Sequence, residues 1–158
     1  MINLMNQNSG PGQQALRKGR HSTPGGIYLV TAVTEQRTPW FQEQDLATLT
    51  AQSIAGADDR YGTRTFCWVV MPDHFHWLVQ TGKLPLEQTV NRLKGASARG
   101  LNAKIGRKGR FWAPGFHDRA LRREEDLKRV ARYVVGNPLR AGLVSQIGDY
   151  PFWDAVWL

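Results

Sequence analysis

Two β-type runs follow each other almost without interruption in the middle of the chain. Residues 63–71 and 74–81 are rich in β-branched and aromatic side chains, and only Pro72-Asp73 separates them. Because so short a connection joins antiparallel neighbours, the two runs predict a hairpin. Successive side chains of a strand point to opposite faces, so the second run places His74 and His76 on one face.

The remaining patterns predict helices and two more strands around this hairpin. A β run over residues 27–34 comes first, and loose helical spacing of apolar residues follows over 42–55. We expect a long helix from Pro85, a fourth strand over 116–122, and a last helix that begins with the acidic residues 124–126. The order β-α-β-β-α-β-α predicts an α+β fold with a ferredoxin-like antiparallel sheet and helices.

The length of 158 residues and the 41% hydrophobic content suit one domain with tails. We expect a flexible basic arm over residues 1–22, a main domain over 23–145, and a segment over 146–158 that packs on this domain. No run at the start resembles a signal sequence, and none is apolar enough to cross a membrane. The single cysteine, Cys67, excludes an intrachain disulfide and a multi-thiolate zinc site, which fits a cytoplasmic protein.

The net charge of +8 is unevenly distributed. The segment from Arg92 to Arg132 holds thirteen Lys and Arg and only four acidic residues, so it carries the whole basic excess. A polyanion such as nucleic acid is the expected partner, and a general solubility charge is the alternative. The candidate cationic contacts, together with one histidine of the N-terminal arm, are Arg17, Lys18, Arg20, His21, Arg92, Lys94, Arg99, Arg107, Lys108, Arg110, Arg119 and Arg129.

The basic loop over residues 106–110 runs directly into Phe111 and Trp112. Basic grooves that carry aromatic rings suit unpaired bases, so both rings are candidates for stacking on DNA. Packing in the core is the alternative for them. The N-terminal arm likewise either follows the backbone of a DNA hairpin or stays a solvated tail.

His74 and His76 are close enough in the predicted strand to hold one divalent metal ion. Two buried rings that are hydrogen-bonded to backbone are the alternative. With no cysteine or carboxylate obviously near, the ligand set is incomplete for structural zinc. Open coordination positions are what a metal needs if it is to polarise a phosphodiester oxygen.

Tyr133 lies off the apolar stripe of the last predicted helix. Arg129 and Asn137 are four residues to either side, so the three are expected to share one line on the helix surface. A phenol can attack a phosphate, a guanidinium can hold it, and an amide oxygen can bind a metal. A half-buried surface tyrosine is the alternative, and Pro138 disfavours helical backbone at Asn137.

Three stretches of the chain match a known pattern. They are Tyr28-Leu-Val-Thr31, Met71-Pro-Asp-His-Phe-His-Trp-Leu-Val79 and Tyr133-Val-Val-Gly-Asn-Pro-Leu-Arg-Ala-Gly-Leu-Val144, and Phe111-Trp112 and Asp118-Arg119 fit the intervening pattern. Together they resemble the REP-associated tyrosine transposases, a bacterial branch of the single-tyrosine HUH transposases. The resemblance extends over residues 20–150.

This resemblance implies an HUH fold in which His74 and His76 bind the metal and Tyr133 is the nucleophile. It implies that Asn137 is the third ligand, at a position where related insertion-sequence transposases place a glutamine. The implied cofactor is Mg²⁺ or Mn²⁺. The implied reaction cuts single-stranded DNA beside an imperfect hairpin and leaves a 5′-phosphotyrosine and a free 3′-hydroxyl. A monomer is expected rather than the dimer of the insertion-sequence enzymes.

Three functions stay open at this point. The first is a metal-dependent transposase that nicks and rejoins DNA. The second is a non-catalytic regulator that binds hairpin DNA or RNA, and the third is a metal-dependent hydrolase on a similar fold. A covalent protein–DNA adduct that Tyr133→Phe abolishes separates the first from the other two.

Overall fold

The computed structural model describes residues 22–122 and 125–157. The candidate DNA contacts of the N-terminal arm, Arg17, Lys18, Arg20 and His21, lie outside the described residues. No helix in the described ranges has the length and apolar character needed to span a bilayer.

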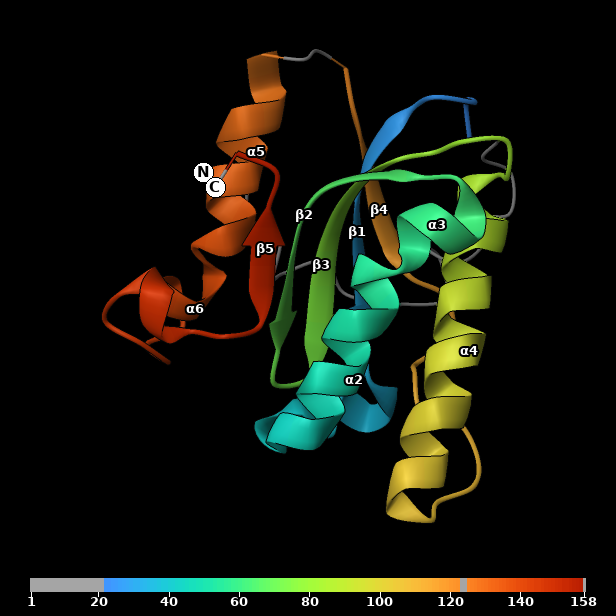
Figure 1. Ribbon diagram of the computed structural model, residues 1–158, viewed down its shortest axis with the longest axis vertical. Coiled ribbons are helices and arrows are strands. Elements are labelled where there is room, and N and C mark those ends of the chain that lie inside the picture. The colour runs from blue at the N-terminus through green and yellow to red at the C-terminus, as the bar shows by residue number, and fades with distance from the viewer. Residues whose placement is uncertain (1–21, 123–124, 158) are drawn as a thin grey trace.

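A five-stranded antiparallel sheet forms the centre of the fold (Figure 1). Its strands are β1 (Ile27–Val33), β2 (Arg64–Met71), β3 (His74–Gln80), β4 (His117–Leu121) and β5 (Trp153–Ala155). They lie side by side in the order β4-β1-β3-β2-β5. The first four strands have the ferredoxin-like arrangement, so the predicted fold class is confirmed. The edge strand β5, which pairs with β2, is an element that the sequence pattern does not predict.

Helices cover both faces of the sheet, as Figure 1 shows. One face carries the helices between β1 and β2 and between β3 and β4, whereas the other carries the two helices that follow β4. The helices are α2 (Gln44–Ala55), α3 (Ala57–Tyr61), α4 (Leu86–Ile105), α5 (Glu125–Val135) and α6 (Asn137–Arg140), and short 3₁₀ turns are η1 (Glu35–Arg37), η2 (Trp40–Gln42) and η3 (Ile147–Asp149).

Strand β3 separates two cores because its side chains alternate. Phe75 and Trp77 pack in the core that α2 and α4 cover, whereas Leu78 packs with apolar residues of α5. His76 is two residues before Leu78 and His74 is four residues before it, so both point to the α5 face of the sheet. The imidazole pair and the helix that carries Tyr133 therefore share one face.

Phe111 and Trp112 are core residues. They are only 1% and 3% exposed, and both rings pack against Phe41. The indole of Trp112 also donates a hydrogen bond of 3.0 Å to the Ser97 hydroxyl. Rings enclosed in this way have no free face for a base. Burial thus corrects the prediction that these two residues stack on DNA and favours the packing alternative.

The last predicted helix is interrupted at Gly136. Because Pro138 has no N–H, it cannot donate to the carbonyl of Val134 four residues earlier. The side chain of Asn137 fills this role, and its Nδ2 donates to the Val134 carbonyl at 2.9 Å. Asn137 is buried, whereas Tyr133 is half-buried and Arg129 is exposed. The prediction of one line along a single helix is therefore wrong, because α5 ends before Asn137.

Candidate metal and nucleophile site

The rings of His74 and His76 lie together in the interior. Their centroids are 4.8 Å apart and their planes meet at 76°. Only 5% of His74 and 1% of His76 is exposed. Two imidazoles so close and so well buried need polar partners, since a buried polar group without one is costly.

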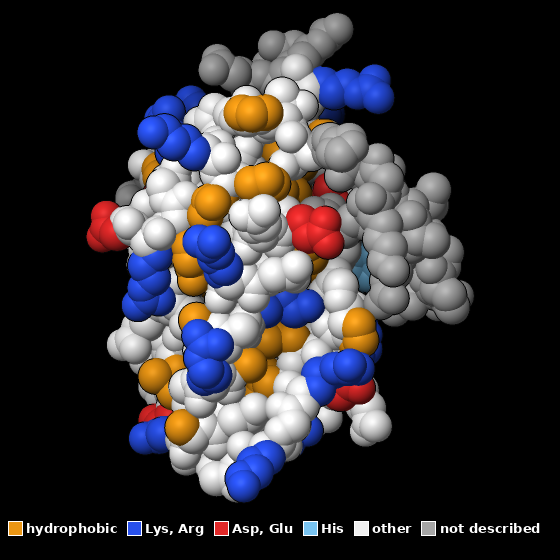
Figure 2. Space-filling view, turned by 90° about the vertical axis from the view of Figure 1, so that its right-hand side faces the viewer, with side chains coloured by type: hydrophobic (Ala, Val, Ile, Leu, Met, Phe, Trp, Pro, Cys, Tyr) orange, Lys and Arg blue, Asp and Glu red, His pale blue; other side chains and the backbone are white. Residues whose placement is uncertain are grey.

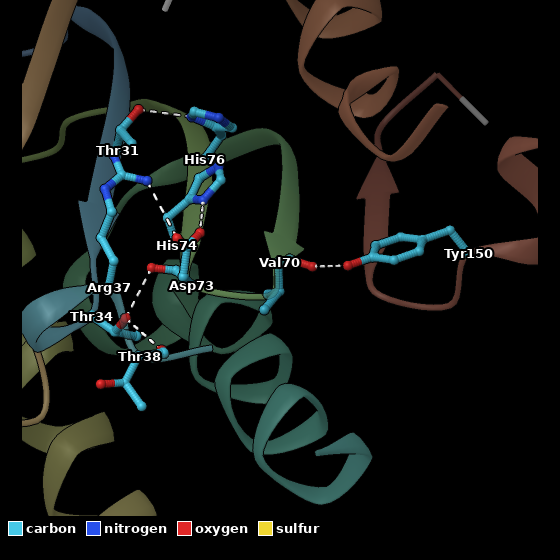
Figure 3. A network of polar contacts seen from close by, with 9 residues as sticks. All are labelled: Thr31, Thr34, Arg37, Thr38, Val70, Asp73, His74, His76 and Tyr150. Atoms are coloured by element: carbon cyan, nitrogen blue, oxygen red, sulfur yellow. Dashed lines mark hydrogen bonds and ion pairs between the residues drawn. The ribbon is translucent and has the colours of Figure 1, made fainter. Parts of the chain in front are cut away.

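The hydrogen-bond partner of His74 is the residue before it, Asp73. Its Nδ1 donates to Asp73 Oδ1 at 2.6 Å, and Arg37 lies 3.3 Å from the other carboxylate oxygen (Figure 3). The hydrogen bond with His74, supported by the charge of Arg37, lowers the pKa of Asp73. An ionised carboxylate only accepts, so the proton of a neutral His74 is on Nδ1 and the lone pair is on Nε2.

The hydrogen-bond partner of His76 lies on the neighbouring strand β1. Its Nδ1 lies 2.7 Å from the Thr31 hydroxyl, directly opposite in the β1–β3 register (Figure 3). Burial, and then the charges of His74 and Arg140, lower the pKa of His76 well below 6.5. The ring is therefore neutral near pH 7, as a metal ligand must be.

Neither Nε2 of this pair has a hydrogen-bond partner among the described residues, although both atoms are buried. Two orphaned nitrogens on adjacent rings, each ring oriented through its other nitrogen, fit the donor set of a divalent metal. Within the described ranges no three His, Cys, Asp or Glu side chains converge on one point. Other ligands to a metal would thus be an amide oxygen, water or substrate.

Of the two side-chain amide atoms of Asn137, only Oδ1 has the chemistry of a metal ligand. Its Nδ2 donates a hydrogen bond to the Val134 carbonyl, and the residue is 2% exposed. The short helix α6 that it begins packs against β2, which is the strand next to β3. The role of Asn137 as third ligand stays a prediction.

Tyr133 lies on α5 and its ring is covered by an arginine from α6. The guanidinium carbon of Arg140 is 3.8 Å from the centroid of the Tyr133 ring. The same guanidinium donates through Nη2 to the backbone carbonyl of Tyr133. The role of Tyr133 as nucleophile stays a prediction.

A polar strip continues across the sheet from His76. Thr31 of β1 stands opposite His76 on one side and His117 of β4 on the other, so the three share a face. Arg119 follows His117 by two residues and shares this face. Burial, and then the charge of Arg37, lower the pKa of His117. Since α5 packs mainly on β2, β3 and β5, this strip lies beside the helix.

The predicted cationic contacts divide between the two sides of the sheet. Arg119 is on the side of the imidazole pair, and Arg129 is on α5. The exposed residues Arg92 and Arg99 lie on α4, and the exposed residues Lys108 and Arg110 follow it in the loop. Figure 2 shows Lys and Arg spread over the face that carries α4. This larger basic surface is therefore separated from the imidazole pair by the sheet.

Two cations of this set hold the loop that follows α4. Lys94 donates to the carbonyls of Ala113 and Gly115 at 2.9 and 2.5 Å. Burial, and then the charge of Arg110, lower the pKa of Lys94 to about 8. Arg107 donates to the Arg110 carbonyl at 3.0 Å. These contacts favour a structural role, and DNA contact by either residue stays a prediction.

Sequence reasoning missed the residues that orient the site. Asp73 precedes His74 within a motif already quoted, and Thr31 ends another, so both had a signal in the sequence. Arg140 lies in the third quoted stretch, but its contact with Tyr133 depends on the return of α6. Arg37 lies outside all three stretches and contacts Asp73 from η1.

Comparisons with known proteins identify relatives of this chain. A REP-associated tyrosine transposase of Escherichia coli K12 is 29% identical over 87 residues, which is 54% of this chain and 50% of the relative. A Haemophilus influenzae protein with the same family designation is 24% identical over 144 residues, covering 84% of this chain and 81% of the relative. The chain thus aligns with only half the length of the first relative.

A solved structure has the same fold. It is a REP-associated tyrosine transposase bound to a REP hairpin, with a TM-score of 0.70 and 22% sequence identity, and the match covers 85% of this chain and 79% of that one. The resemblance found in the motifs is therefore confirmed. The family model described as "Transposase IS200 like" matches residues 23–137, which is most of the chain, and the protein belongs to this family.

Proposed function

We propose that the protein is a metal-dependent endonuclease and transposase that acts on single-stranded DNA. It nicks and rejoins DNA beside palindromic hairpin repeats through a 5′-phosphotyrosine intermediate. The related structure contains a REP hairpin, which supports the same class of substrate for this chain. We further propose that it acts as a monomer in the cytoplasm.

The observation that carries the proposal is the pair of orphaned Nε2 atoms of His74 and His76. A purely structural pair would be expected to satisfy both ring nitrogens within the protein. Here each ring uses Nδ1 for a protein contact and keeps Nε2 free on the face that carries α5. This division is typical of metal-binding histidines.

The two imidazoles, with Asn137 Oδ1, would hold Mg²⁺ or Mn²⁺ and leave coordination positions for a phosphate and water. When bound, the metal would stabilise charge on the nonbridging phosphate oxygens. Asp73 and Thr31 hold the ring orientations that this requires. The partly nitrogen-based set favours Mn²⁺ over Mg²⁺, which prefers oxygen ligands.

The covalent step uses Tyr133. Its phenol oxygen forms a bond to phosphorus and loses its proton, while the bond from phosphorus to the 3′ oxygen breaks and that oxygen takes up a proton. The phosphate diester is conserved as a 5′-phosphotyrosine, so a DNA 3′-hydroxyl can attack it and rejoin strands. Neither ATP nor a redox partner is needed for this exchange.

The test is adduct formation on a labelled oligonucleotide. Hairpin oligonucleotides with single-stranded flanks, copied from palindromic repeats near the gene, are incubated with the protein and Mn²⁺ or Mg²⁺. The expected product is a denaturation-resistant protein–DNA band that is absent with Tyr133→Phe and absent with EDTA. Binding without an adduct would support the regulator instead, and cleavage without an adduct would support the hydrolase.

A further inference from the structure

The end of α5 is completed by side chains from α6. Pro138 removes one backbone donor, and the side chain of Asn137 replaces it at the Val134 carbonyl. The carbonyl of Tyr133 is bound by the guanidinium of Arg140. Both contacts fall in the last turn of the helix, where backbone carbonyls have no partner of their own. The predicted nucleophile therefore lies in the turn that Arg140 holds.

The same guanidinium also covers the Tyr133 ring. Its central carbon is 3.8 Å from the ring centroid, which is a close cation–π contact. The planar group thus makes two contacts with one residue, one with the backbone and one with the side chain. Two contacts in different directions restrict both the position of the helix end and the rotation of the ring.

Gly136 makes this path possible. A Cβ at position 136 would lie 2.8 Å from Nη1 of Arg140 and 3.0 Å from the Arg132 carbonyl. Because the first distance is shorter than real Cβ contacts, any larger residue would displace the guanidinium. The glycine between Tyr133 and Arg140 therefore leaves the space that the guanidinium occupies.

Arg140 belongs to α6, which packs against β2. In the pairing of β2 with β3, Val69 lies opposite His76 and Met71 lies opposite His74. The helix that carries Arg140 therefore packs on the strand next to the proposed metal ligands. From this helix the guanidinium of Arg140 contacts both the ring and the backbone of Tyr133.

From these contacts we infer that Arg140 is the positioning residue of Tyr133, holding the phenol ring for attack on a DNA phosphodiester beside His76. This inference rests on the proposed function. A lysine cannot take this role, because its ammonium is compact and cannot lie flat on a ring while donating to a carbonyl. Arg140→Lys therefore keeps the positive charge but removes the planar group that contacts the ring and the carbonyl.

The first experiment measures the single-turnover rate of adduct formation with Mn²⁺ and the hairpin oligonucleotide. Arg140→Ala is expected to lower this rate by about 10- to 100-fold, the loss typical of a misplaced reacting group. Arg140→Lys should stay close to the alanine variant, and Gly136→Ala should also be slow although the charge is kept. Arg60→Ala, which removes an exposed arginine from α3, is the control for the loss of one positive charge. The Kd of Arg140→Ala for the oligonucleotide should differ from the wild-type Kd by no more than that of Arg60→Ala.

The second experiment does not depend on catalysis. With ring-¹³C tyrosine, the NMR signals of Tyr133 should shift in Arg140→Ala and in Arg140→Lys, while those of Tyr28 and Tyr61 stay in place and report an intact fold. If the wild-type protein forms no adduct, the proposed function fails, and these signals still decide whether Arg140 holds the ring.

Two results would overturn the inference. One is a Tyr133 spectrum that is identical with and without the arginine. The other is an Arg140→Lys variant that forms the adduct at the wild-type rate, since charge alone would then be sufficient.

Discussion

The two faces of the sheet differ in how completely their polar groups are satisfied. The face under α2 and α4 is closed by apolar side chains such as Phe75, Trp77 and Phe111. The face under α5 is apolar near Leu78 and Val134, but it ends in two buried imidazoles with orphaned nitrogens. The apolar face therefore contributes most to the free energy of unfolding. The α5 face contributes less, because it keeps two unsatisfied nitrogens for a ligand.

The largest expected effect is on the closed face. Phe75 is fully buried, and its ring meets Trp112 edge to face at 5.3 Å between centroids. Phe75→Ala should lower the free energy of unfolding by about 3–5 kcal/mol, because it leaves a cavity in packed surroundings. Urea denaturation measures this loss, and Phe75→Leu provides a milder variant that keeps the fold. A loss below 1 kcal/mol, on the order of an exposed site, would contradict the description of this face as the stabilising one.

The next effect is on the open face. His76→Ala removes one proposed ligand and should weaken Mn²⁺ binding by more than about 100-fold, beyond the loss caused by a residue that only orients a ligand. In EDTA the same variant should lose much less stability than Phe75→Ala, since the imidazole carries an unsatisfied nitrogen. Calorimetric titration with Mn²⁺ checks the first statement. Undiminished Mn²⁺ affinity would exclude His76 as a ligand.

A smaller effect should follow from loosening the residues that orient the two rings. Asp73→Ala and Thr31→Val each remove the fixed partner of one Nδ1 atom. Both should weaken Mn²⁺ binding by about 10- to 100-fold. The loss should be larger for Asp73, since a carboxylate is the stronger hydrogen-bond acceptor. Equal affinity in all three proteins would show that the imidazoles are oriented by packing alone.

The pH dependence of stability should also distinguish the two faces. The pKa of His76 in the folded state lies well below its ordinary value of 6.5, so near and below pH 6.5 the unfolded chain binds a proton that the folded one does not. The contribution of His76 to the free energy of unfolding is therefore fully present above pH 6.5. It falls as the pH drops, by up to about 1.4 kcal/mol per pH unit.

Denaturation of the metal-free protein between pH 8 and pH 5 measures this slope. His76→Gln should make it shallower, whereas Phe75→Leu should lower stability by the same amount at every pH. The lowered pKa of Asp73 contributes with the same sign, but its effect begins only near the ordinary pKa of 3.8, below the range from pH 8 to pH 5. A wild-type slope that survives in His76→Gln would assign it to other groups.

The smallest expected effect is at the exposed loop after α4. Lys108→Ala should leave stability unchanged and reduce the salt dependence of single-strand binding by about 0.7 in the log–log slope, as for one phosphate contact. Titrations of a labelled oligonucleotide at several salt concentrations check this. An unchanged slope would place the DNA elsewhere, for example along Arg119 on the polar strip.

Local patterns predicted the parts of this molecule that depend on neighbouring residues. Alternation alone placed His74 and His76 on one face, and the order of elements was sufficient for the ferredoxin-like sheet. These features follow from backbone periodicity and from short connections, which a sequence shows directly.

Contacts that depend on chain reversal were not predictable in the same way. The burial of Phe111 and Trp112 depends on rings from other elements, and a basic loop before them suggested stacking on DNA instead. The break between α5 and α6 at Gly136 was signalled by Pro138, yet the return of Arg140 onto the tyrosine ring requires the path of α6.

The central claim is that the orphaned nitrogens of His74 and His76 hold a divalent metal on the open face. A crystal of the protein soaked in Mn²⁺ tests it most directly through anomalous scattering. The expected result is one strong peak at about 2.0–2.3 Å from both Nε2 atoms, a normal metal–imidazole distance. A crystal with no peak there, and with both Nε2 atoms hydrogen-bonded to protein groups, would contradict the account.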